Sequence, residues 1–150
     1  QGRVLGIDFS LTMLERATGS SRVLGAANVA FVRADAERLP VASASVDVVL
    51  VNGIFNLNPR RDAIFRELAR IAKPGGSVFG AELILRAPLA EDQRAGNANW
   101  FSCIAGAREA VAFLEEFRQA GFREVQLLRT TRNARTKSPA VLAADFRAVR

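Results

Sequence analysis

The chain has 150 residues, one cysteine, no histidine and a formal net charge of +6. The single cysteine excludes a disulfide framework, and the absence of histidine excludes the usual zinc sites, Ser-His-Asp triads and the common acid–base catalyst at neutral pH. The length predicts one domain, residues 1–150, with a core of its own. No apolar run reaches the ~18 residues of a membrane span, and the N-terminus lacks the basic-then-apolar region of a signal peptide. We therefore expect a cytoplasmic protein with a reduced thiol.

The excess of positive charge invites a nucleic-acid interpretation, which the distribution of the charges does not favour. Arginines are scattered with acids between them, except over residues 123–150, where seven basic residues accompany two acids. No aromatic residue stands among the basic residues of 129–137, as a base-stacking platform would need. We interpret that stretch as a solvated loop and expect no nucleic-acid partner. The alternative hypothesis is that 123–150 binds a polyanion.

The first third of the chain alternates strand and helix patterns. A short apolar run over residues 3–7 predicts a strand, and Ser10 is a good N-cap for a helical pattern over 11–19. Residues 29–33 predict a second strand. Residues 46–51 are nearly all apolar and β-branched, which predicts a strand buried on both faces of a parallel sheet.

The rest of the chain continues the alternation and ends in two strands. A helix from about 59 to 72 is ended by the Lys-Pro-Gly-Gly cluster at 73–76, and a strand follows over 77–85. Residues 86–107 predict a loop with a short helix, and 109–120 predict a helix that ends before a glycine. The last two predicted strands, an antiparallel pair joined by the basic segment, are 122–128 and 140–149.

This order predicts an α/β domain with helices on both faces of a mostly parallel sheet and a C-terminal antiparallel strand pair. Ligands in such sheets bind outside the carboxyl ends of the strands. Polar residues stand at or near four of these predicted ends: Asp8, Asp35, Asn52 and Glu82.

Three segments, in this order, resemble the class I S-adenosylmethionine-dependent methyltransferases. They are 4–10 (VLGIDFS) with Met13, Leu14 and Ala17; 35–40 (DAERLP) with 45–49 (SVDVV); and 65–71 (FRELARI) with 73–76 (KPGG). The closer likeness is to the arsenite methyltransferase-like and ubiquinone/menaquinone methyltransferase-like branch. It rests on 52–57 (NGIFNL), on Trp100 with 103–107 (CIAGA), and on 120–122 (AGF). The resemblance covers most of the chain and implies a Rossmann-like fold.

The resemblance also implies a site for S-adenosylmethionine. Its residues in this chain are Asp8, Phe9, Met13, Asp35, Ala36, Asn52 and Gly53. The carboxylate of Asp8 would accept hydrogen bonds from both ribose hydroxyls. Asp35 would accept from the adenine amino group, and the Ala36 amide would reach a ring nitrogen. Phe9 and Met13 would offer apolar faces to adenine. Asn52 would present its backbone at the methionine end, and Gly53 would face the cofactor at the same strand end.

One departure from the family concerns its first strand. The acidic residue and Gly-x-Gly-x-Gly loop that end this strand in the family are absent from the chain, which begins where the second strand begins. The first strand is normally central, so its loss would expose two ladders of unpaired backbone groups. We therefore expect either that the 3–7 strand pairs directly with 46–51 or that a second copy completes the sheet in a homodimer.

The second departure concerns the methyl acceptor. Related arsenite methyltransferases grip arsenic(III) with several thiolates, whereas only Cys103 stands at such a position here and Gly53 stands where a cysteine is common. One thiol cannot form that chelate, so we do not expect arsenite specificity. Trp100 and Cys103 are the candidate residues of an acceptor pocket, and no metal site is expected.

These observations lead to two hypotheses of different classes. The first is methyl transfer from S-adenosylmethionine to a small-molecule acceptor, impaired to the extent that the missing glycine-rich loop is needed. The alternative is a non-catalytic remnant of the same fold that dimerises or binds a partner. The residue pattern assigns no catalytic acid, base or nucleophile to either hypothesis.

Overall fold

The computed structural model describes residues 2–89, 104–133 and 138–150. Its contacts divide the chain into two compact units, which we call the N-terminal unit (1–40) and the C-terminal unit (41–150). Each unit is described by itself, and the expectation of a single domain over 1–150 stays a prediction.

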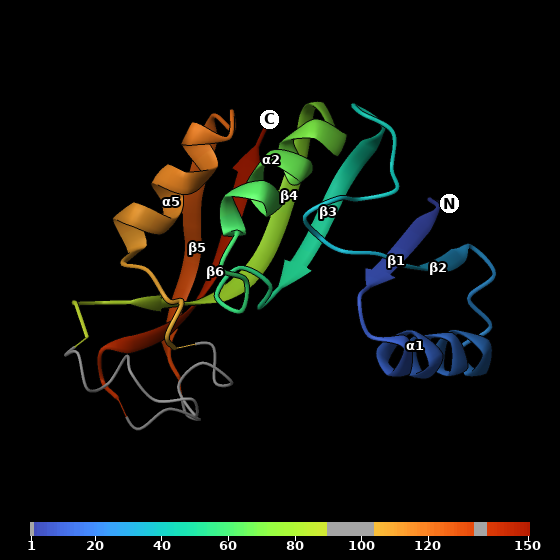
Figure 1. The fold of residues 1–150 in the computed structure, drawn as a ribbon, viewed down its shortest axis with the longest axis horizontal. Coiled ribbons are helices and arrows are strands. Elements are labelled where there is room, and N and C mark those ends of the chain that lie inside the picture. The colour runs from blue at the N-terminus through green and yellow to red at the C-terminus, as the bar shows by residue number, and fades with distance from the viewer. Residues whose placement is uncertain (1, 90–103, 134–137) are drawn as a thin grey trace. The chain divides into compact units, whose positions relative to one another are not determined.

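The N-terminal unit is a two-stranded parallel sheet with one helix (Figure 1). Strand β1 (Val4–Asp8) pairs with β2 (Val29–Arg33), so that Asp8 stands opposite Arg33. Helix α1 (Leu11–Val23) begins after Ser10, whose hydroxyl accepts a hydrogen bond from the Met13 amide at 3.4 Å. The N-cap prediction is thereby confirmed, and the helix runs beyond its predicted end at residue 19.

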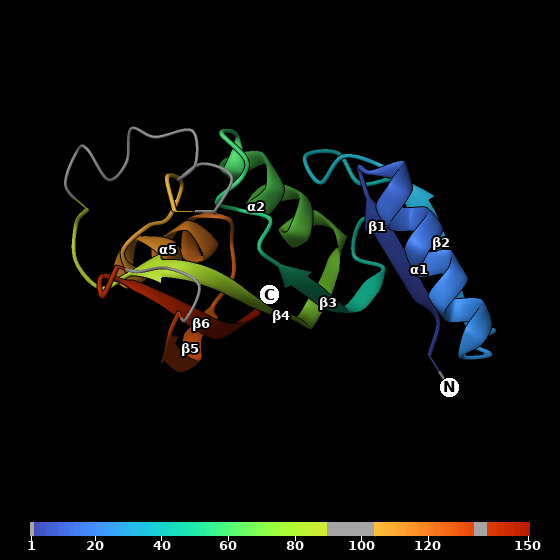
Figure 2. The ribbon, with the colours of Figure 1, turned by 90° about the horizontal axis from the view of Figure 1, so that it is seen from below.

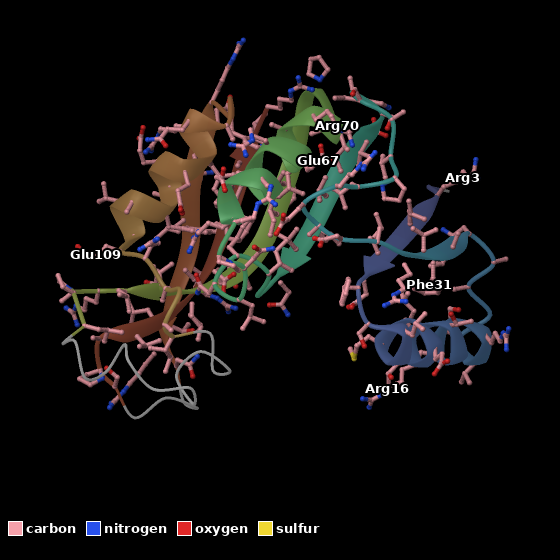
Figure 3. The ribbon with its side chains drawn as sticks, viewed as in Figure 1. Arg3, Arg16, Phe31, Glu67, Arg70 and Glu109 are labelled. Atoms are coloured by element: carbon pink, nitrogen blue, oxygen red, sulfur yellow. The ribbon has the colours of Figure 1, made fainter. Side chains whose placement is uncertain are left out.

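A close contact inside this small sheet explains the glycine in the middle of β1. A Cβ added to Gly6 would lie 2.5 Å from Cδ1 of Phe31, whose ring lies on the α1 side of β2 (Figure 3). The aromatic ring occupies the space that a larger residue at position 6 would need, so the pair packs because position 6 has no side chain.

The C-terminal unit is a four-stranded mixed sheet in the order β3-β4-β6-β5. Its strands are β3 (Val46–Asn52), β4 (Ala72–Leu85), β5 (Glu124–Arg132) and β6 (Val141–Val149). The first two are parallel, whereas β6 is antiparallel to both β4 and β5. The predicted α/β fold with parallel strands and a C-terminal antiparallel pair is confirmed.

Helices α2 (Arg61–Ile71) and α5 (Ala110–Gln119) lie on the same face of this sheet (Figure 2). Between helices and sheet lies a cluster of buried phenylalanines: Phe55, Phe65, Phe113, Phe117, Phe122 and Phe146. The rings of Phe55 and Phe65 are stacked with centroids 4.3 Å apart, and most other pairs meet edge to face. Such pairs add about 0.5–1.5 kcal/mol each beyond the burial of their area. The described part of this unit places no helix on its other face, so helices on both faces are not found here.

Strand β3 differs from its prediction in burial. The side chains of Val48 and Leu50 are 53% and 79% exposed, although an apolar run had predicted a strand buried on both faces. Among the described strands β3 pairs only with β4, and β1 pairs only with β2. The expected pairing of residues 3–7 with 46–51 would join the two units and stays a prediction, and within the C-terminal unit β3 is an edge strand of the sheet.

Two segments predicted as breaks or loops belong to strands. The 73–76 cluster ends α2 as expected but lies within β4, where the Gly75 amide donates to the Arg150 carbonyl at 2.8 Å. Arg129 and Arg132, assigned to a solvated loop, lie in β5. Arg129 forms an ion pair with Asp145 on the neighbouring strand at 2.9 Å. Pairing with β6 extends β5 beyond its local sequence signal, and the backbone bonds to Arg150 together with the pairing of Ala72 with Val46 extend β4.

Candidate functional site

The carboxyl end of the β1–β2 pair brings two predicted site residues to one edge. Asp8 ends β1, and Asp35 follows β2 by two residues. The amide of Ala34 donates to the Asp8 carbonyl at 3.2 Å, so the chain leaving β2 runs beside the end of β1. Parallel strands present their carboxyl ends at the same edge of a sheet, and this edge therefore carries both carboxylates.

Asp8 has a structural role at this edge. Its Oδ1 accepts a hydrogen bond from the Ser10 amide at 2.8 Å, which fixes the turn into α1. The side chain is half-buried. A carboxylate has two oxygens with about four acceptor positions, so this single bond leaves capacity for further donors.

Asp35 organises a tight turn. Its Oδ1 accepts from the Glu37 amide at 2.9 Å, and its carbonyl accepts from the Arg38 amide at 3.0 Å. Aspartate commonly makes such turns by bonding to the backbone two residues on. Ala36 lies inside the turn and is half-buried.

Two apolar side chains stand exposed next to Asp8. Phe9 is 68% exposed and Met13 is 50% exposed. The guanidinium of Arg33 lies 5.2 Å from the centre of the Phe9 ring, and its Nε donates to the Phe9 carbonyl at 2.9 Å. Arg33 was not among the predicted site residues. Its position as the last residue of β2, opposite Asp8, is the signal that could have found it.

In the C-terminal unit, Asn52 and Gly53 stand at the carboxyl end of β3. Asn52 is the last residue of the strand and is exposed. The Gly53 amide donates to the Ala81 carbonyl of β4 at 3.0 Å, and Gly53 has φ +65°. A Cβ added there would meet no atom within 4 Å, so the backbone conformation, and not space, favours glycine. Both residues lie at the strand end where they were predicted.

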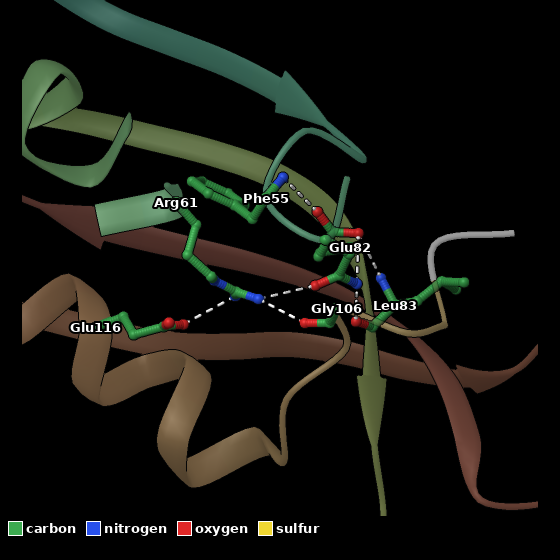
Figure 4. Close-up of polar contacts among 7 residues, drawn as sticks. Phe55, Arg61, Glu82, Leu83, Gly106 and Glu116 are labelled. Atoms are coloured by element: carbon green, nitrogen blue, oxygen red, sulfur yellow. Dashed lines mark hydrogen bonds and ion pairs between the residues drawn. The ribbon is translucent and has the colours of Figure 1, made fainter. Parts of the chain in front are cut away.

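A buried carboxylate supports the loop that follows Gly53 (Figure 4). Glu82 of β4 is 4% exposed. Its Oε2 accepts from the Phe55 amide at 3.0 Å, and its Oε1 accepts from Asn56 Nδ2 and the Leu83 amide, each at 3.0 Å. Burial raises the pKa of Glu82, and these N–H donors oppose the rise. Glu82, which was expected near a strand end, is therefore buried and bonds to the loop that follows Gly53.

Arg61, the first residue of α2, is the second buried charge near this loop. It is 7% exposed. Its Nη1 donates to Asn56 Oδ1 at 3.2 Å and to the Gly106 carbonyl at 2.7 Å, and its Nη2 lies 2.8 Å from Glu116 Oε2. Burial lowers the pKa of Arg61 and raises the pKa of Glu116, while their mutual attraction opposes both shifts. Sequence reasoning missed Arg61; an arginine in a first helical turn, against the helix dipole, was the available signal.

Two predicted pocket residues, Trp100 and Cys103, lie outside the described residues. Within ranges 2–89, 104–133 and 138–150, no group of three or more acidic, cysteine or histidine residues could hold a metal ion. The same ranges contain no helix long and apolar enough to cross a bilayer.

Comparison with known protein families gives one match over most of the chain. The family model that matches is described as a methyltransferase domain, and it covers residues 1–131.

Several similar sequences belong to the two groups that the motifs indicated. An arsenite methyltransferase of Halobacterium salinarum is 31% identical over 126 residues, which cover 84% of this chain and 32% of that protein. One from Aquipseudomonas alcaligenes is 31% identical over 134 residues, covering 85% and 39%. The ubiquinone/menaquinone biosynthesis C-methyltransferase UbiE of Azotobacter vinelandii is 39% identical over 85 residues, covering 54% and 32%. The chain thus spans 32–39% of the length of these relatives.

Solved structures share the fold at lower identity. An arsenic(III) S-adenosylmethionine methyltransferase from Chlamydomonas reinhardtii matches with a TM-score of 0.85 and 22% identity, over 99% of this chain and 55% of that one. A phosphoethanolamine N-methyltransferase of Haemonchus contortus in complex with S-adenosyl-L-methionine matches with a TM-score of 0.78 and 17% identity, over 99% and 43%.

Proposed function

The chain belongs to the class I S-adenosylmethionine-dependent methyltransferases, in the branch of the arsenite and ubiquinone/menaquinone methyltransferases, and from this premise we propose that it transfers a methyl group from S-adenosylmethionine to a small-molecule acceptor. The observation that carries the proposal is the edge formed by β1 and β2. It combines two carboxylates, Asp8 and Asp35, with two exposed apolar side chains, Phe9 and Met13. Ribose hydroxyls and an exocyclic amine need acceptors, and an adenine ring needs apolar surface.

The hydrogen-bonding groups of this edge, two carboxylate acceptors and one backbone amide donor, suit the nucleoside half of the cofactor. Asp8 would bind the ribose hydroxyls with the acceptor capacity that its bond to Ser10 leaves. Asp35 would accept from the adenine amino group, with the amide of Ala36 directed to a ring nitrogen. Asn52 and Gly53 would present backbone groups at the methionine end.

The proposed chemistry places few demands on side chains. Bound S-adenosylmethionine supplies an electrophilic methyl group on a sulfonium. The protein's part is to hold donor and acceptor in line, which provides most of the rate when the nucleophile is already reactive. A chain without histidine is compatible with this task.

We propose an acceptor other than arsenite, although relatives carry that activity in their names. The chain has a single cysteine, and a chelate of arsenic(III) needs several thiolates. Trp100 and Cys103 remain the proposed acceptor-pocket residues.

Calorimetric titration of S-adenosylhomocysteine and S-adenosylmethionine into the chain tests the cofactor site. Micromolar binding that is retained in Asp47→Ala, an exposed carboxylate on β3, and lost in Asp35→Ala would support the proposal. Absence of heat and of a thermal shift in the unmodified chain would refute it.

The second candidate function is a non-catalytic domain that dimerises, and the exposed edge strand favours it. Val48 and Leu50 present apolar side chains on β3, which pairs only with β4 among the described strands. An edge of this kind is a template for further pairing. We propose that a second copy covers it in a homodimer. Light scattering across a concentration series should give a dimer mass that Leu50→Glu reduces to the monomer, and a monomer at every concentration would contradict the dimer.

A further inference from the structure

Two segments far apart in the sequence are packed backbone to backbone in the C-terminal unit. One is the loop 53–58, which leads from β3 to α2, and the other is the segment 104–107, which leads to α5. A Cβ added to Gly106 would overlap the carbonyl oxygen of Asn56. Position 106 is therefore restricted to glycine by the opposing backbone, and the two segments cannot separate without losing this contact.

One side chain bonds to both segments. Arg61 donates from Nη1 to Asn56 Oδ1 at 3.2 Å and to the Gly106 carbonyl at 2.7 Å (Figure 4). Its second terminal nitrogen, Nη2, is held by Glu116 of α5 at 2.8 Å. The planar guanidinium can direct donors to three partners at once, which a lysine ammonium on one nitrogen cannot reproduce in the same geometry.

Asn56 is the residue through which Arg61 acts on the loop. Both donors of its amide are used, one on Glu82 Oε1 at 3.0 Å and one on the Leu83 carbonyl at 2.7 Å. Its oxygen accepts from Arg61. The side chain is 1% exposed, so removal of Arg61 would leave a buried acceptor without its partner.

We propose that Arg61 is a positioning residue that clamps loop 53–58 to segment 104–107 and thereby sets the backbone at the end of β3. This inference rests on the proposed function, because Asn52 and Gly53 stand at the start of the clamped loop and are the proposed contacts to the methionine end of the cofactor. Arg61 contacts no cofactor in this scheme; it acts through Asn56 and Gly106.

The test measures the clamp and its consequence separately. Amide hydrogen exchange of Phe55, Asn58 and Ala107 reports the two segments, because the Phe55 amide donates to the Glu82 carboxylate and the other two amides donate to carbonyls of their own segments. Calorimetry with S-adenosylhomocysteine, under conditions where circular dichroism shows every variant folded, reports the site.

Arg61→Met removes the three contacts while it keeps much of the apolar stem. It should speed exchange of the three amides about tenfold and weaken S-adenosylhomocysteine binding about tenfold, as expected for the loss of charge-assisted hydrogen bonds. Arg61→Lys should restore both values in part. The matched control is Arg66→Met, the same substitution on the solvent side of α2, where the side chain is 65% exposed. Val125→Ala controls for global destabilisation, since it changes a buried side chain on β5 far along the chain from both segments.

Each result decides the proposal. Faster exchange and weaker binding in Arg61→Met, with both controls unchanged, support it. Exchange equal to the unmodified chain overturns the clamp, and faster exchange with unchanged binding overturns its effect on the site. If the unmodified chain binds no S-adenosylhomocysteine, the proposed function fails and the amide exchange alone decides whether Arg61 clamps the two segments.

Discussion

Substitution of Asp8 separates its structural role from its proposed cofactor role. The structure shows one bond of this side chain, from the Ser10 amide to Oδ1 at 2.8 Å. Asp8→Ala removes that bond and should lower the free energy of unfolding by about 1 kcal/mol, the net value of a half-buried hydrogen bond. Asp8→Asn keeps an oxygen for the Ser10 amide, so its stability should stay close to that of the unmodified chain.

Cofactor binding should respond differently to the same two variants. Two ribose hydroxyls bonded to a carboxylate gain about 1 kcal/mol each over bonds to a neutral amide, which gives about 2 kcal/mol for Asp8→Asn. This corresponds to a Kd for S-adenosylhomocysteine about 30-fold weaker. Asp8→Ala should weaken binding further, by at least about 100-fold, because no acceptor remains.

Urea denaturation and calorimetry on the three proteins provide the two measurements. Thr12→Ala, an exposed residue of the same helix, is the control for substitutions near the start of α1. If Asp8→Asn binds S-adenosylhomocysteine as well as the unmodified chain does, Asp8 serves only the turn into α1 and its assignment as a ribose ligand is wrong.

Three further predictions follow from the C-terminal unit. Phe117→Ala should lower the free energy of unfolding by about 3–5 kcal/mol in urea denaturation, because the side chain is 0% exposed among five other rings; a loss below about 1 kcal/mol would contradict the packing. Gly53→Ala should cost about 1–2 kcal/mol, since its φ is +65° and only the backbone opposes a Cβ, and an unchanged urea midpoint would show that the turn relaxes. Burial raises the pKa of Glu82 and Glu116 in the folded protein, so the folded state holds protons that the unfolded state releases as pH rises through 4.5. The contribution of these two groups to the free energy of unfolding therefore falls as pH rises above 4.5. Glu116→Gln should flatten this decline in a pH series of urea midpoints, and the same decline in Glu116→Gln as in the unmodified chain would contradict the shift of Glu116.

The sequence predicted most elements because their signals are local. The strand at 29–33 is observed with the predicted bounds, and the helix at 59–72 is observed as Arg61–Ile71. Apolar runs, an N-cap serine and a glycine after a helix act within a few residues, so a single chain shows them.

Features that depend on distant partners were not predictable in this way. The apolar run of β3 has the same pattern whether the strand is central or at an edge, so its exposed Leu50 could not be foreseen. The burial of Arg61 requires Glu116 on another helix, 55 positions away. Asp8 and Asp35 were placed at strand ends from sequence, yet their common edge became evident only from the register of β1 and β2.

The position of β6 affects how the C-terminal unit can fold during synthesis. This strand comes last in the chain but lies inside the sheet, with β4 on one side and β5 on the other. Its Phe146 also enters the aromatic cluster that holds both helices. A ribosome must therefore release residues up to about the end of β6 before β4 and β5 can be joined, since no earlier strand of the unit bonds them directly. Until then two strand edges and the phenylalanine cluster of the nascent unit stay exposed. Chaperones bind exposed apolar surface of this kind.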